Sequence, residues 1–174
     1  METWDAIRAR RNVRSYSDRP IPPDDLDRIL EAGRRTPSSM NDQPWDFVVC
    51  TERDALRELA HTWRYAAHVA GSAATIVLVA ADPADPADPD ERDWMFYDMG
   101  QATLQMMLAA ADLGIGSSHA GIGDQELTRR VLGIPADRLC VGMLALGFPA
   151  ERPLHPIEHP SRRPFDEVVH RDGW

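Results

Sequence analysis

Two short apolar runs, at residues 73–80 and 139–146, constrain the fold of this chain more than any other feature. Apolar runs of this length, bounded by polar or turn residues, are typical of strands buried within a sheet. Between them, residues 94–113 repeat at helical spacing and carry few charges after Asp98, which predicts a long, buried central helix. The residues that carry this spacing are Tyr97, Gln101, Leu104, Leu108 and Ala111.

The rest of the chain predicts shorter helices and one more strand. Pro22 and Pro23, followed by two acids, are typical of a helix start, and Pro37 ends that helix. The apolar residues of segment 46–50 predict a buried strand. Three further short helices are predicted. One follows Thr3 as its N-cap, and one spans residues 127–132 before Gly133. The third contains Leu56, Leu59, Ala60 and Trp63.

We expect residues 1–174 to form one domain, because 174 residues with 43% hydrophobic content suffice for a single core. The acidic, proline-rich repeat at 82–92 is expected to be an exposed loop. After Gly147 the chain is punctuated by prolines, so residues 148–174 are expected to form an extended tail that runs along a surface, such as that of a second subunit.

The net charge of -9 makes binding to nucleic acid unfavourable, because phosphate contacts need a basic surface. The sequence shows no leader and no apolar run long enough to cross a bilayer, so we expect a cytoplasmic protein without a membrane partner. Cys50 and Cys140 lie in apolar runs and are expected to be buried free thiols, with a disulfide possible and unneeded.

All 19 basic residues are arginines, and the absence of lysine excludes several kinds of chemistry. A Walker-type phosphate loop needs a lysine after its glycines, and an enzyme that forms a Schiff base needs a lysine amine. No Gly-x-Ser-x-Gly elbow is present either. His155 and His159 are separated by Pro156, which breaks the helix that a metal pair at this spacing would need, so no metal is expected.

Arginines are concentrated near the N-terminus in a chain that is otherwise acidic. The segment from Arg8 to Arg14 contains four arginines and no acid. Neighbouring positive charges repel unless an anion compensates them, and the forked guanidinium suits phosphate oxygens. The cluster therefore predicts a phosphate site, with a solvated surface as the alternative.

Hydroxyl and amide side chains gather in the loop from Pro37 to Trp45, directly before the strand at 46–50. Such groups can bind a planar ligand rich in heteroatoms, although an ordinary Asx or Ser turn has a similar composition. A second candidate segment, residues 114–123, contains four glycines that would let main-chain amides approach a ligand. His119 stands where a dinucleotide loop would need its third glycine, so that motif is disfavoured.

Together these segments resemble the FMN-dependent nitroreductase family over nearly the whole chain. The most specific matches are residues 10–16, Arg-Arg-Asn-Val-Arg-Ser-Tyr, and the loop from Pro37 to Trp45. The resemblance implies an α+β, three-layer fold in which a mixed, mostly antiparallel sheet is wrapped by helices. It also implies an intertwined homodimer with two FMN sites at the subunit interface.

The resemblance also implies roles for individual residues. Arg10, Arg11 and Arg14 would hold the FMN phosphate together with Arg162 or Arg163, and Asn12 would lie near the ribityl chain or the phosphate. The loop residues would reach the flavin from the other subunit, with Asn41 at the pyrimidine edge, and amides near Gly121 and Ile122 would bind flavin N5 and O4. The full predicted set of cofactor-binding residues is Arg10, Arg11, Asn12, Arg14, Pro37, Ser38, Ser39, Asn41, Gln101, Ser118, His119, Ala120, Gly121, Ile122, Arg162 and Arg163.

The implied activity is a ping-pong reaction in which NADH or NADPH reduces the flavin and a small organic acceptor, such as a nitroaromatic compound or a quinone, is then reduced. No catalytic side chain is required, because the flavin carries the chemistry. The alternatives are a flavin store or sensor without nicotinamide turnover, a related flavoenzyme such as a dehydrogenase, dehalogenase or benzimidazole synthase, and a protein that merely dimerises.

Two features depart from the family pattern. Tyr65 and His68 stand where many relatives carry polar or Lys residues near the flavin. The segment that holds helices over the flavin in larger relatives contains only the Asp-Pro repeat here, which predicts a less covered site and broad tolerance of acceptors.

Overall fold

The computed structural model describes residues 1–82 and 89–174, apart from the side chains of residues 89 and 90. Four strands form one sheet in the order β1-β2-β4-β3, and all neighbouring strands are antiparallel. A single parallel bridge joins Asn12 to Ser117. The strands are β1 (Asp46–Cys50), β2 (Ala74–Ala81), β3 (Gly116–Ala120) and β4 (Arg138–Gly147).

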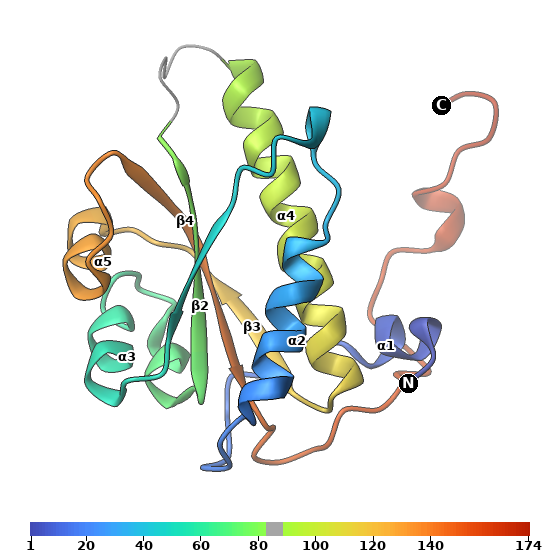
Figure 1. Ribbon diagram of the computed structural model, residues 1–174. Helices are drawn as coiled ribbons and strands as arrows, with labels where there is room; N and C mark the ends of the chain where they lie inside the picture. The colour runs from blue at the N-terminus through green and yellow to red at the C-terminus, as the bar shows by residue number, and fades with distance from the viewer. Residues whose placement is uncertain (83–88) are drawn as a thin grey trace.

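Helices cover both faces of this sheet, which confirms the predicted α+β, three-layer fold (Figure 1). The helices α2 (Pro23–Arg34) and α4 (Pro89–Asp112) lie on one face, and α3 (Arg53–Leu59) and α5 (Gln125–Leu132) lie on the other. The short helix α1 (Thr3–Ala9) lies near the C-terminal end of α4. Three 3₁₀ turns complete the elements: η1 (Ser39–Asn41), η2 (Ala67–Gly71) and η3 (Phe165–Glu167).

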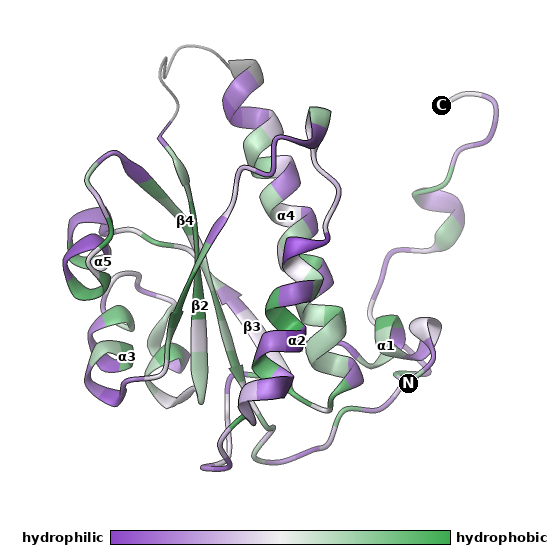
Figure 2. Cartoon of the chain, viewed as in Figure 1, coloured by the Kyte–Doolittle hydropathy of each residue, from purple (hydrophilic) through white to green (hydrophobic). Residues whose placement is uncertain are grey.

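The strand β2 contributes to two hydrophobic cores because successive side chains of a strand point to opposite faces. Ile76, Leu78 and Ala80 belong to the core under α2 and α4, whereas Val77 and Val79 belong to the core under α3 and α5. Burial on both faces explains why this strand is apolar at nearly every position, and Figure 2 shows the hydrophobic strands between helices with polar outer surfaces.

Most predicted elements are confirmed, and local signals explain their ends. Pro23 lies in the first turn of α2, and Met99, Met106 and Met107 of α4 are buried in the core, as is Met95 of the same helix. The Asp124 side chain accepts the Leu127 N–H at 2.8 Å and caps α5, which ends at Gly133 with a φ of 65°. Cys50 and Cys140 are buried free thiols, as expected.

Several local predictions were wrong. Glu2 is the N-cap of α1, so Thr3 is its first residue. Residues 116–120 were expected to form only a glycine-rich turn, but they form the strand β3. Pairing with β4 stabilises this strand although its residues have weak strand propensity. The edge strand β1 is fully buried only at Cys50, and Trp63 lies beyond the end of α3.

The long helix also differs in detail from its prediction. It begins at Pro89, so the expected loop at 82–92 is helical in its last part, while residues 83–88 lie outside the described residues. Tyr97 and Leu104 are exposed at 62% and 49%, because the buried stripe runs through Met99, Ala102 and Met106. The helix therefore presents an apolar face that the chain itself does not cover.

The tail, residues 148–174, is mostly exposed. It is extended apart from the short turn η3. It passes α1, where the Ile157 N–H donates to the Arg8 carbonyl at 3.1 Å, and then leaves the body of the molecule (Figure 1). No helix within the described residues is long and apolar enough to cross a membrane. The same residues contain no group of three metal-binding side chains.

Candidate functional site

The arginine segment after α1 is fixed to the sheet by its main chain. The Val13 N–H donates to the Ser117 carbonyl at 2.9 Å, next to the bridge between Asn12 and Ser117. Gly116 permits this close approach, because a Cβ there would lie 2.7 Å from the Val13 side chain. Arg10, Arg11 and Arg14 are consequently held at the beginning of β3.

Arg11 contacts the start of the tail instead of an acid. Its guanidinium donates to the Arg152 carbonyl at 2.5 Å and to the Pro153 carbonyl at 3.4 Å. Burial, followed by the charge of Arg152, lowers the pKa of Arg11. A small hollow of about 140 Å³ is lined by Arg11, Arg14 and Arg152, together with Asn12 and one acid, Glu151. Three arginines around one hollow favour an anion there.

Arg152 is a member of this cluster that the sequence did not indicate. It belongs to the proline-punctuated tail, and main-chain pairing between Tyr16 and Pro149 brings the tail back beside the arginine segment. Arg162 and Arg163, the tail arginines that were predicted to hold the phosphate, make other contacts within this chain. Arg162 donates to the Ser161 carbonyl, and Arg163 pairs with Glu167 at 3.5 Å.

Two buried polar atoms near this cluster have no partner within the described residues. These atoms are the Oγ of Ser118 in β3 and the Nε2 of His68 in η2. Burial, followed by the charge of nearby Arg14, lowers the pKa of His68. An unsatisfied buried polar group costs about 1–3 kcal/mol, so this arrangement suits a bound ligand with hydrogen-bonding atoms.

The end of β3 exposes main-chain donors. The amides of Gly123 and Asp124 both donate to the Thr62 carbonyl at 2.9 Å, which fixes the turn that follows. In the described part of the chain, the amides of Gly121 and Ile122 have no main-chain acceptor outside the regular helices and strands. A Cβ at Gly121 would lie 3.7 Å from the Trp63 ring, so this ring packs beside the turn.

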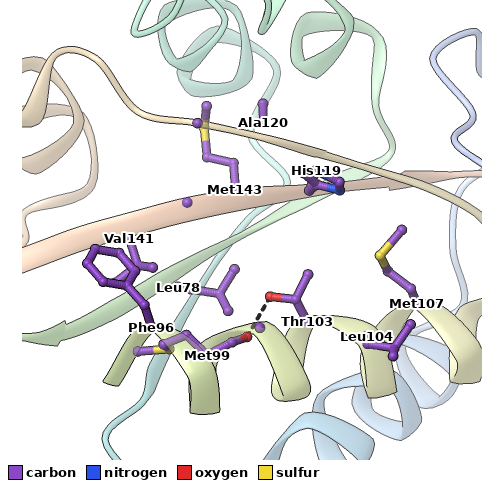
Figure 3. Close-up of a pocket in the computed structure, with 13 residues that line it drawn as sticks. Leu78, Phe96, Met99, Thr103, Leu104, Met107, His119, Ala120, Val141 and Met143 are labelled. Carbon is purple, nitrogen blue, oxygen red and sulfur yellow. Dashed lines mark hydrogen bonds between the residues drawn. The ribbon is translucent and has the colours of Figure 1, made fainter. Parts of the chain in front are cut away.

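An apolar cavity of about 400 Å³ adjoins these donors, between α4 and the sheet (Figure 3). Phe96, Met99 and Leu104 extend toward it from α4, and Met143 extends toward it from β4. On the sheet side it is also lined by His119, Ala120 and Gly121, three members of the predicted set. The cavity can therefore accept an apolar or aromatic group next to main-chain N–H donors.

The loop after α2 has a strained backbone. Met40, Asn41 and Gln43 have positive φ angles of 48°, 63° and 51°. Asn tolerates this left-handed region, whereas a residue such as Met or Gln costs about 1–2 kcal/mol there. Met40 is 93% exposed, so packing of its side chain does not offset this strain.

Asp98 of α4 anchors this loop. It is 3% exposed and accepts the Ser39 N–H at 3.0 Å through Oδ2 and the Gln101 side-chain amide at 3.1 Å through Oδ1. The Gln43 N–H donates to Ser38 Oγ at 2.9 Å and closes the loop on itself. A hydrogen bond to a charged group contributes about 1.5–3 kcal/mol, which is comparable with the strain.

The loop and the arginine cluster lie at opposite ends of α4. The Ser39 N–H of the loop donates to Asp98. The amino group of Met1, just before α1, pairs with Asp112, fourteen residues further along α4. At 1.5 Å per residue these positions are about 21 Å apart. Figure 1 shows the loop toward one end of α4 and α1 near the other, so one chain does not bring the loop and the arginine segment together.

The chain is similar to known proteins over nearly its whole length. The model of the Nitroreductase family matches residues 7–64 and 59–148. A protein of Archaeoglobus fulgidus named for NADH dehydrogenase/NAD(P)H nitroreductase activity is 34% identical over 172 residues, which span 97% of this chain and 96% of that protein.

Solved structures show the same fold. A nitroreductase of Desulfovibrio desulfuricans in complex with FMN superposes with a TM-score of 0.79 at 28% identity and covers 100% of this chain and 98% of its own. The NADPH:FMN oxidoreductase of Vibrio harveyi, complexed with NAD+, superposes with a TM-score of 0.83 at 24% identity, covering 97% of this chain and 76% of its own.

Proposed function

The chain belongs to the nitroreductase family, and on this premise we propose that it is an FMN-dependent oxidoreductase that uses NADH or NADPH to reduce a small organic acceptor, such as a nitroaromatic compound or a quinone. The relatives support this proposal through the FMN complex of one and the NAD(P)H nitroreductase name of another. The observation that carries it is a pair of buried atoms, Ser118 Oγ and His68 Nε2, that have no hydrogen-bond partner among the described residues.

The residues present fit the parts of FMN. The hollow lined by Arg11, Arg14 and Arg152 suits the phosphate, because arginine forks form charge-assisted bonds to phosphate oxygens. Arg10 and Asn12 belong to the same segment and would complete this part of the site. The amides of Gly121 and Ile122 offer donors to a ring edge, and the adjoining apolar cavity suits an aromatic ring system or acceptor.

FMN, when bound, supplies the two-electron chemistry that no side chain of this protein can perform. The arginines neutralise and orient the phosphate end. The amides near Gly121 and Ile122 stabilise negative charge that develops at the ring edge. The apolar wall of Phe96, Met99 and Leu104 excludes water from the reacting face. None of these roles requires a side-chain acid or base.

We also propose a homodimer, which the separation between the loop and the arginine cluster supports. Two copies related by a two-fold axis would bring the loop of one chain to the cluster of the other, which completes two equivalent sites. The face of α4 that exposes Phe96, Tyr97 and Leu104 is the surface we assign to this contact. The tail also exposes Phe165 and Val168, which suits a segment that wraps a partner.

We place this activity in the cytoplasm. Cys50 and Cys140 are buried free thiols on different strands, which suits a reducing compartment.

The test is an absorption spectrum of the purified protein, followed by anaerobic addition of NADH and then NADPH, with the released flavin identified by mass. We expect a yellow protein that releases FMN and bleaches with a nicotinamide. A flavin that does not bleach would support a flavin store or sensor. A colourless protein that takes up no FMN would exclude both functions.

A further inference from the structure

We propose that Asp98 is a positioning residue that holds the strained loop, residues 38–43, in the conformation that reaches the flavin of a partner subunit. The inference rests on the proposed function, because the flavin is the ligand that the loop would meet. It concerns a buried carboxylate that the sequence did not indicate as part of any site.

The burial of Asp98 is hard to explain by stability alone. The side chain is 3% exposed, and within the described residues no arginine forms a salt bridge with it. Its neighbours Met95, Met99 and Ala102 on the same helix belong to the hydrophobic core. A buried carboxylate is unfavourable unless its oxygens are well satisfied, and an apolar residue would pack here without that penalty.

Asp98 provides one acceptor that joins the loop to α4 and a second that is satisfied within α4. One oxygen accepts the main-chain N–H of Ser39, and the other accepts the side-chain amide of Gln101. Because the loop contributes a main-chain group, this contact fixes the path of its backbone whatever side chain occupies the position. The positive φ of Met40 and Gln43 follows directly, so the strained part of the loop begins at the anchor.

The anchor also ties the loop to the surface assigned to the dimer. Tyr97 precedes Asp98 in α4, is 62% exposed, and contacts the Trp94 ring edge-on at 5.8 Å between centroids. A rigid helix that carries both the loop anchor and the partner contact would set the position of Asn41 relative to the partner. Asp98 therefore acts through the loop and does not itself touch the flavin.

Substitutions can separate the hydrogen-bonding role from core packing. Asp98→Leu removes both acceptors and fills the site with apolar volume, and Asp98→Ala serves as a second removal variant if one of them fails to fold. Asp98→Asn keeps one oxygen for Ser39, and its new amide can donate to Gln101 once that side-chain amide rotates. Asp112→Asn is the control, because Asp112 lies on the same helix and contacts only Met1 and Arg28 among the described residues.

The first readout is amide hydrogen exchange of residues 38–45 in the full-length protein without FMN. We expect Asp98→Leu to accelerate exchange there about tenfold or more, as expected for the loss of a hydrogen bond to a charged group, while Asp98→Asn and Asp112→Asn stay near the wild type. Unchanged exchange in Asp98→Leu, or equal acceleration in Asp98→Asn, would overturn the proposal.

The second readout is the dissociation constant of FMN, measured by flavin fluorescence. It should rise about tenfold in Asp98→Leu and be restored in Asp98→Asn, because a loosened loop no longer holds its residues at the flavin. A loop that loosens while the FMN affinity stays unchanged would also overturn the proposal. If the wild type fails to bind FMN or to be reduced by a nicotinamide, the proposed function is overturned instead. Hydrogen exchange of the loop in the FMN-free protein would still decide whether Asp98 anchors the loop.

Discussion

Gly116 and Val13 lie so close that a Cβ on the glycine would be 2.7 Å from Cβ and Cγ2 of the valine. The contact holds the arginine segment against β3, where Val13 also donates its N–H to Ser117. We expect Gly116→Ala to displace this segment, to lower the free energy of unfolding by about 1–3 kcal/mol and to weaken FMN binding.

Chemical denaturation and FMN titration measure the two effects. Gly71→Ala is the matched control, since a Cβ at Gly71 meets nothing within 4 Å. The double substitution Gly116→Ala with Val13→Gly should recover part of the FMN affinity, because it removes the Val13 side-chain atoms that the new methyl group would meet. A fully stable Gly116→Ala variant with unchanged FMN affinity would contradict the assigned role of this contact.

The arginine cluster predicts a strong dependence of FMN binding on charge. Arg10→Ala combined with Arg14→Ala should weaken FMN binding about a hundredfold or more, because charge-assisted bonds to the phosphate are lost. Titration of the flavin-free protein by fluorescence quenching measures this. Arg57→Ala is the control, since Arg57 is exposed and pairs only with Asp54 within the described residues. Unchanged FMN retention in the double variant would show that the phosphate binds elsewhere.

His68 predicts a loss of stability in acid. Burial and the charge of Arg14 hold its pKa below the ordinary value of 6.5. Between the two pKa values the unfolded chain binds more protons than the folded one, so stability that is present at neutral pH is lost as the pH falls below about 6.5. Urea unfolding at about pH 7.5 and about pH 5.5 should show this, and His68→Gln should reduce the difference. An equal reduction in His61→Gln would assign the effect to a different histidine.

The apolar cavity predicts broad tolerance of acceptors. Its walls are formed by side chains such as Phe96, Met99 and Met143, which offer shape and few directional contacts. We expect kcat/KM to vary by no more than about a hundredfold across a panel of nitroaromatic compounds and quinones, because apolar contacts discriminate weakly. One acceptor preferred far beyond this range in steady-state kinetics would contradict the prediction.

The elements with a strong local signal could be predicted from the sequence. The strands β2 and β4 are apolar because both of their faces are buried, and α2 and α5 carry end signals such as Pro23 and Gly133 that act within a few residues. The arginine segment and the loop after Pro37 were likewise visible, since their composition is unusual over a short stretch. These two segments were the most specific part of the resemblance to the family.

The long-range arrangement was decided only by the tertiary structure. The polar and glycine-rich β3 is a strand because β4 pairs with it, and Arg152 joins the cluster because the tail returns beside Tyr16. Asp98 anchors a loop that is 59 residues away in sequence, and nothing local to Asp98 indicates that partner. Sequence patterns report propensity and burial over a few residues, whereas contacts between distant segments depend on how the helices pack on the sheet.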